Sequence, residues 1–174
     1  MRETINGKEQ MKNPWEGMQV LIVGMARSGI ALAQLLCRQG ACVTVNDMKD
    51  EASFGDKLNG LKEMPICFRL GENGLAALEG KDLLIISPGV PIDAPIVKAA
   101  REKNIAVSGE LEIASRLIRG SMVAVTGTNG KTTTVSLLGA IFEAAGKIAY
   151  VAGNIGYPLS AAAMECKYED AVVA

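Results

Sequence analysis

The residues best suited to chemistry form one continuous stretch, Thr126-Gly127-Thr128-Asn129-Gly130-Lys131-Thr132-Thr133. An apolar run typical of a β-strand (122–126) leads into it, and a segment with helical periodicity (132–145) follows. Glycines in such a turn let consecutive backbone N–H groups point at phosphate oxygens, and the N-terminus of the following helix adds partial positive charge. The stretch predicts a nucleotide-phosphate loop in which Lys131 contacts the β- and γ-phosphates and the Thr132 hydroxyl coordinates Mg²⁺.

The spacing of this loop departs from the general pattern G-x-x-x-x-G-K-[ST], because Val125 stands five positions before Gly130 and the nearer glycine is Gly127. A plain glycine turn followed by a surface lysine is the alternative interpretation. The coincidence of glycine, lysine and two threonines at a strand-to-helix junction favours the phosphate loop.

A second glycine loop, Gly24-Met25-Ala26-Arg27-Ser28-Gly29, joins an apolar run (20–23) to a helical segment (29–38). Asp47 follows the next apolar run (42–46), 18 positions after Gly29. The pattern is one residue short of the dinucleotide fingerprint G-x-G-x-x-G with a later acidic residue, because Ala26 stands at the middle glycine position. The loop predicts either a degenerate dinucleotide-type phosphate site or a plain turn that begins a helix.

These two loops need a scaffold in which strands and helices alternate. Further strands are predicted at 83–87, 105–107, 148–152 and 171–174, and further helices at 94–103, at 110–118 and from Leu159 onward. Such alternation predicts an α/β fold, in which a Rossmann-like parallel sheet with helices on both faces precedes the start of a P-loop ATPase α/β domain. The boundary is predicted near Gly109, between a domain at 1–108 and the front part of another at 109–174.

Composition limits the function classes. The 174 residues are 49% hydrophobic and 21% charged with a formal net charge of -1, as in ordinary globular proteins, and no basic stripe indicates nucleic-acid binding. The absence of histidine excludes Ser-His and Cys-His nucleophile pairs and most zinc sites from this stretch. The cysteines (Cys37, Cys42, Cys67 and Cys166) lack C-x-x-C spacing and are expected to be buried core residues. The polar N-terminus and the lack of a long apolar stretch predict a cytoplasmic protein that does not enter a membrane.

The shortened loop T-G-T-N-G-K-T-T resembles that of the Mur ligases and of their relatives, the folylpolyglutamate synthases. Three further segments are similar to Mur ligases: Ser87-Pro88-Gly89-Val90-Pro91, Ser108-Gly109-Glu110-Leu111-Glu112 and Gly153-Asn154-Ile155-Gly156. The resemblance covers residues 18–174. It implies that ATP phosphorylates a substrate carboxylate and that an amine then attacks the acyl phosphate to form an amide.

A Rossmann-like unit before a T-N-G-K loop resembles the branch of that family which adds D-glutamate to UDP-N-acetylmuramoyl-L-alanine in peptidoglycan precursor synthesis; an alanine-adding ligase is the alternative. The resemblance implies a monomer that uses ATP and Mg²⁺. It implies that ATP binds to Gly127, Thr128, Asn129, Gly130, Lys131, Thr132 and Thr133, of which Lys131 and Thr132 are catalytic. It also implies a UDP site whose diphosphate lies near Arg27, Ser28, Gly89 and Asn154 and whose uracil lies near Asp47, Met48 and Lys49.

A P-loop enzyme also needs a carboxylate near its Mg²⁺, and the resemblance implies one shortly after Ala174. Residues 1–174 are therefore expected to be the front part of a longer enzyme and to be inactive alone. Two rival functions stay open from the sequence. One is an oxidoreductase domain that binds a dinucleotide through the first loop and Asp47, and the other is a regulatory nucleotide-binding module.

Overall fold

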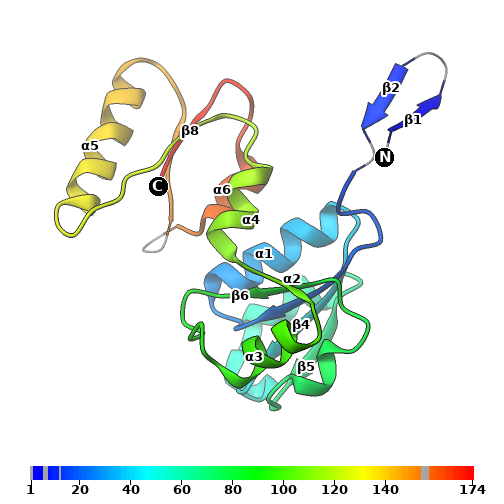
Figure 1. Cartoon of the computed structure of the whole chain (residues 1–174). Helices are drawn as coiled ribbons and strands as arrows, with labels where there is room; N and C mark the ends of the chain where they lie inside the picture. The colour runs from blue at the N-terminus through cyan, green and yellow to red at the C-terminus, as the bar shows by residue number, and fades with distance from the viewer. Residues whose placement is uncertain (1, 6–7, 12, 154–156) are drawn as a thin grey trace.

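The larger of two α/β units is built on a five-stranded parallel sheet (Figure 1). The structure is a computed structural model and describes residues 2–5, 8–11, 13–153 and 157–174, with side chains described from residue 13 onward. In spatial order the strands are β5 (Cys67–Leu70), β4 (Cys42–Asp47), β3 (Gln19–Val23), β6 (Leu83–Ile86) and β7 (Ala106–Gly109). The chain crosses from one side of β3 to the other after β5, and ligands of such sheets bind outside the carboxyl ends of the strands at this point.

Apolar residues on both faces explain this sheet. Residues 20–23 and 83–86 are buried throughout, as expected for central strands that are covered on both sides. One face packs against α1 (Arg27–Arg38), the 3₁₀ segment η1 (Glu51–Leu58) and α2 (Asn59–Lys62). The other face packs against the 3₁₀ segment η2 (Leu75–Leu78) and α3 (Pro95–Glu102). The predicted α/β architecture, a parallel sheet with helices on both faces, is confirmed.

The second unit follows α4 (Glu110–Leu117) and holds a smaller parallel sheet. Its strands lie in the order β8 (Ser121–Val123), β10 (Ala171–Val173) and β9 (Ala149–Val151). Its helices are α5 (Lys131–Ala144) and α6 (Leu159–Glu165). On α5, Leu137 and Ile141 are 61% and 53% exposed, so an apolar side of this helix faces solvent in this chain.

The two units touch through their helices. α6 packs against both α1 and α4, and these three helices lie next to one another in Figure 1. α1 is therefore covered by the sheet on one side and by α6 on another. On α1, Ala33 and Leu36 are fully buried and Ile30 is partly exposed.

Several elements differ from the sequence predictions. β5, η1, α2 and η2 were not predicted, nor was the antiparallel hairpin of β1 (Arg2–Ile5) and β2 (Lys8–Met11). β8 ends at Val123 and is shorter than the predicted strand at 122–126, although the Val125 N–H still donates to the Ala174 carbonyl (2.6 Å). Among the described residues, no helix is long and apolar enough to cross a bilayer.

The prediction that all four cysteines are core residues is wrong for two of them. Cys166 is buried and Cys37 is half-buried, but Cys42 and Cys67 are exposed. Each exposed cysteine is the first residue of its strand, at the amino-terminal edge of the larger sheet where the strands meet solvent.

Tyr157, in the second unit, has a shifted protonation equilibrium. Partial burial of a residue that is still 36% exposed, together with a hydrogen bond that its hydroxyl donates to Glu165 Oε1 (2.6 Å), raises the pKa of Tyr157 to about 12. The folded state holds this proton more tightly than the unfolded chain. The resulting stability is fully present below the unfolded tyrosine pKa of about 10 and is lost as the pH rises through the folded pKa.

We therefore expect the ultraviolet titration of the folded protein to contain a tyrosine component near pH 12, and Tyr157→Phe to remove it. Tyr168→Phe is the matched control, because the Tyr168 side chain is 80% exposed, and it should leave that component in place. A titration curve that is the same with and without the Tyr157 hydroxyl would contradict the assignment.

Candidate functional site

The first glycine loop is tied to the ends of three neighbouring strands. The Gly24 N–H donates to the Asn46 carbonyl (2.9 Å), and the Met25 N–H donates to Asp47 Oδ2 (2.7 Å). From β6 and its following turn, the Ser87 hydroxyl donates to the Gly24 carbonyl (2.7 Å). The loop is thus held at the carboxyl edge of the sheet, at the point where the general rule for such folds places a ligand.

Gly29 allows the first turn of α1 to pack closely against the backbone of Gly24 at the end of β3. A β-carbon at this position would lie 2.0 Å from the Gly24 carbonyl oxygen, so only glycine fits. This is the role that the third glycine has in a dinucleotide-type loop, the close packing of helix against strand. Ala26, at the middle position, is the extended residue that precedes α1. The loop therefore keeps the close helix packing of the fingerprint without its middle glycine.

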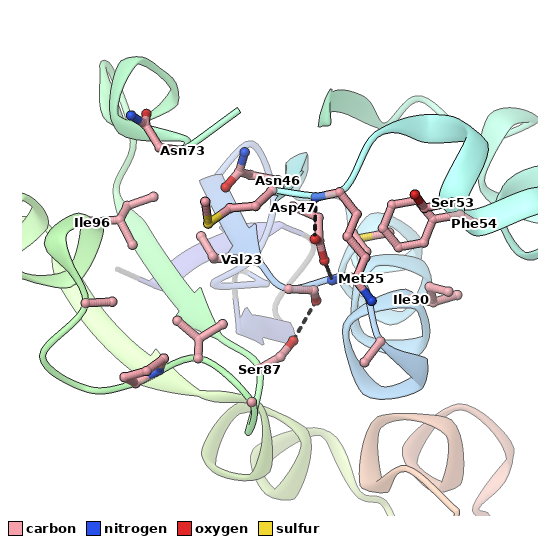
Figure 2. Close-up of a pocket in the computed structure, with 18 of the residues that line it drawn as sticks. Val23, Met25, Ile30, Asn46, Asp47, Ser53, Phe54, Asn73, Ser87 and Ile96 are labelled. Atoms are coloured by element: carbon pink, nitrogen blue, oxygen red, sulfur yellow. Dashed lines mark hydrogen bonds between the residues drawn. The ribbon is translucent and has the colours of Figure 1, made fainter. Parts of the chain in front are cut away.

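A cavity of about 820 Å³ opens beside this loop (Figure 2). Five of the seven residues predicted to bind UDP line it: Arg27, Asp47, Met48, Lys49 and Gly89. Figure 2 shows Asp47 in the middle of the cavity, with Met25, Ile30 and Phe54 to one side and Asn73 and Ile96 to the other. The structure therefore brings together residues from the ends of β3, β4 and β6.

A smaller cavity of about 200 Å³ adjoins the first and lies between the two units. Ser28, the sixth predicted residue, lines it together with Arg27 and Gly89, and the second unit contributes Gly153 and Pro158. Both cavities share Ala26, Arg27, Ser87 and Gly89. A ligand that leaves the large cavity along the glycine loop therefore enters the space between the units. The seventh predicted residue, Asn154, lies outside the described residues.

Further cavity residues were missed from the sequence. Ser53, Phe54 and Lys57 come from η1. Asn73 comes from the turn before η2, Leu75 from η2 and Ile96 from α3. A signal for η1 was present, because Asp50 accepts hydrogen bonds from the Ser53 N–H (3.0 Å) and hydroxyl (2.6 Å), as an N-cap residue does. A signal for the turn at Asn73 was also present, because Asn73-Gly74 is a turn dipeptide and the Asn73 side chain accepts the Leu75 N–H (3.1 Å).

Charge in the large cavity favours an anionic ligand. Three cationic side chains line it (Arg27, Lys49 and Lys57), against the single carboxylate of Asp47. Both oxygens of that carboxylate already accept backbone hydrogen bonds, Oδ2 from Met25 and Oδ1 from the Lys49 N–H (2.9 Å). Each oxygen has a second lone pair, so Asp47 can hold the loop and still accept a bond from a ligand.

The second glycine loop lies at the N-terminus of α5, a helix of 14 residues. Gly130 adopts a left-handed conformation (φ 78°) directly before the helix, and its carbonyl accepts the Thr134 N–H (2.9 Å). The Lys131 ammonium donates to the Gly127 carbonyl across the loop. The β8–β10 pairing continues beside it, since the Ala174 N–H donates to the Val123 carbonyl (3.0 Å).

This loop fits a nucleotide phosphate chemically. It presents a helix N-terminus and a lysine, which are suited to phosphate oxygens. The hydroxyls of Thr132 and Thr133 in the first turn are suited to phosphate or to a phosphate-bound Mg²⁺. Within the part of the chain that the structure describes, no group of three or more His, Cys, Asp or Glu side chains is placed to hold a metal ion.

The fold and the two loops define a class of protein. Residues 18–109, more than half of the chain, match the family model of the Mur ligase MurD-like N-terminal domain, and residues 125–174 match that of the Mur ligase middle domain. The chain belongs to the Mur ligase family.

Relatives of similar sequence carry one name. The chain is 48% identical over 159 residues to the UDP-N-acetylmuramoylalanine--D-glutamate ligase of Thermoanaerobacter sp. (strain X514), covering 91% of this chain and 35% of that protein. It is 44% identical over 156 residues to the ligase of the same name from Caldanaerobacter subterraneus, covering 90% and 35%. The chain thus spans about a third of the length of the curated relatives it matches.

Solved structures show the same fold at lower identity. A pseudomurein peptide ligase type C from Methanothermus fervidus superposes with a TM-score of 0.52 at 23% identity, over 91% of this chain and 32% of that one. The UDP-N-acetylmuramate:L-alanyl-gamma-D-glutamyl-meso-diaminopimelate ligase from Neisseria meningitides gives a TM-score of 0.56 at 20% identity, over 90% and 52%. At these identities the likeness concerns the fold alone.

Proposed function

We propose that the full-length protein is a cytoplasmic ATP-dependent ligase that adds D-glutamate to UDP-N-acetylmuramoyl-L-alanine in peptidoglycan precursor synthesis. The observation that carries the proposal is the presence, in one chain, of a cationic cavity at the first glycine loop and a T-G-T-N-G-K-T-T loop at the N-terminus of α5. The name shared by the relatives at 44–48% identity supports the choice of substrates.

We assign the two substrates to the two units. Residues 1–108 form the UDP-substrate domain and residues 109–174 the start of the ATP-binding domain. In the first, Asp47, Met48 and Lys49 surround the uracil. Arg27, Ser28, Gly89 and Asn154 lie around the diphosphate. A uracil needs an acceptor for its N3–H and donors for its carbonyls, which a carboxylate and a lysine supply. The α1 N-terminus adds partial positive charge beside the diphosphate.

ATP would bind along residues 127–133, with Mg²⁺ on the Thr132 hydroxyl, and would supply the phosphoryl group that activates the substrate carboxylate. Lys131, at the first position of α5, offsets negative charge on the transferred phosphoryl group. The backbone N–H groups of the loop hold the phosphates in place.

Calorimetric titration of residues 1–174 with UDP-N-acetylmuramoyl-L-alanine and with NADH tests the proposal. We expect the UDP substrate to bind more tightly. A dinucleotide needs close backbone approach at the middle loop position, where the Ala26 methyl group stands, and an acidic side chain directed at a ribose. Tighter binding of NADH than of the UDP substrate would contradict the ligase assignment of this unit.

Asp47→Ala should weaken binding of the UDP substrate by about 1–3 kcal/mol, because a buried donor of the uracil loses its partner and the loop loses its tie to Met25. Asp56→Ala is the matched control: it removes the same charge from an exposed carboxylate that contacts only Asn59 among the described residues (3.1 Å). If both substitutions lowered the affinity for the UDP substrate equally, the loss would come from the change in net charge and not from a contact of Asp47 with the ligand.

A further inference from the structure

Glu110 is a buried carboxylate at the joint between the two units. It is 2% exposed and is the first residue of α4, directly after β7 ends at Gly109. None of the ion pairs between described residues includes it. Burial of a carboxylate is costly unless hydrogen bonds compensate, so its partner identifies what it does.

That partner is the start of α6. Glu110 Oε1 accepts the N–H of Ser160 at 2.9 Å, in a fully buried hydrogen bond that spans 50 positions of sequence. α6 begins after Pro158, which has no side-chain acceptor for the free N–H groups of the first turn. The Glu110 carboxylate supplies that missing cap from another helix, and its charge suits the positive end of α6.

Ser160 carries the connection on to the first glycine loop. It is 0% exposed, and its hydroxyl donates to the carbonyl of Ser28 in the first turn of α1 (3.3 Å). Glu110, Ser160 and Ser28 thus link α4, α6 and α1 in one line of contacts. Pro158, two residues before Ser160, lines the 200 Å³ cavity together with Ser28 and Gly89.

We propose that Glu110 is a positioning residue that fixes this wall, and so sets the width of the passage through which the sugar side of a UDP-sugar substrate leaves the large cavity. The inference rests on the proposed function for its ligand. This positioning role differs from a general role in stability, because substitution of Glu110 should then leave the affinity for a ligand confined to the large cavity unchanged.

The test compares two ligands by calorimetry on residues 1–174. In the proposed binding mode, UMP occupies only the large cavity, and UDP-N-acetylmuramoyl-L-alanine extends past Ser28 into the passage. Glu110→Ala should lower affinity for the UDP-sugar about tenfold and change affinity for UMP less than twofold. Glu110→Gln keeps an acceptor oxygen and should restore the UDP-sugar affinity. Glu112→Ala, on the exposed face of the same helix, should change neither.

Equal losses for both ligands in Glu110→Ala, or no loss for either, would overturn the proposal. Glu110→Asp serves if the alanine variant does not fold, because its shorter side chain falls short of the Ser160 N–H while keeping the charge. Failure of the unsubstituted protein to bind the UDP-sugar would reject the proposed function alone. In that case residual dipolar couplings, which report the orientation of the two units relative to each other, still test the positioning role of Glu110. Glu110→Asp should reorient the second unit relative to the first, and Glu110→Gln should not.

Discussion

Lys131→Ala should reduce ATP-dependent ligation by the full-length enzyme by about 10²- to 10³-fold, the effect of removing one preorganised donor from a developing negative charge. The ammonium lies at the first position of α5 and already reaches across the loop to the Gly127 carbonyl. The measurement is phosphate release and amide formation with UDP-N-acetylmuramoyl-L-alanine, D-glutamate and Mg·ATP. Affinity for the UDP substrate should not change, because Lys131 does not line either cavity beside the first loop.

Lys147→Ala is the matched control for Lys131→Ala. This lysine belongs to the same unit, and its ammonium donates to the Glu169 carbonyl at the surface (3.3 Å). It should leave ligation unchanged. Near wild-type ligation by the Lys131→Ala enzyme would show that residues 127–133 are not the phosphate loop.

Gly29→Ala should destabilise the chain by about 3 kcal/mol, at the upper end of the range for forcing extra atoms into a packed site. The added carbon would stand 2.0 Å from the Gly24 carbonyl oxygen, which is backbone and cannot rotate away. Alanine is the better helix former by up to about 1 kcal/mol, but this gain is too small to offset the overlap. α1 must therefore shift away from the strand, and affinity for the UDP substrate should fall along with stability.

Urea unfolding measures this change, and Gly60→Ala provides the comparison. A β-carbon at Gly60, in α2, would meet Gln34 Nε2 at 3.6 Å, an ordinary contact, so stability should stay the same or rise slightly. If Gly29→Ala were as stable as Gly60→Ala, the close helix–strand contact would not be a requirement of the fold.

Local sequence patterns predicted most of the two sheets because their strands are short apolar runs and their helices are periodic. Val20 to Val23, for example, are apolar in sequence and buried in the structure. β5 was missed because Arg69 interrupts its apolar residues; the strand lies at the edge of the sheet, where its residues alternate between exposed and half-buried positions. η1 was missed because its helical path is interrupted at Gly55, which breaks the period.

The candidate site was predictable where a motif names its residues and was not where only folding brings them together. Asp47 and Arg27 follow from the first glycine loop, and both line the large cavity. Lys57 reaches the same cavity from η1, where the Asp50 cap marks the start of the segment but no motif marks the lysine. Glu110 and Ser160 lie 50 positions apart and meet only because α6 folds back against α4.

The first glycine loop is held by bonds that the protein makes with itself: those of Gly24 with Asn46 and Ser87, and that of Met25 with Asp47. The loop therefore loses its conformational entropy when the protein folds, and nucleotide binding does not carry this cost. Encounter should require no rearrangement of the loop, so association ought to be fast and similar for different uridine nucleotides. Their affinities would then differ through how long each one stays bound.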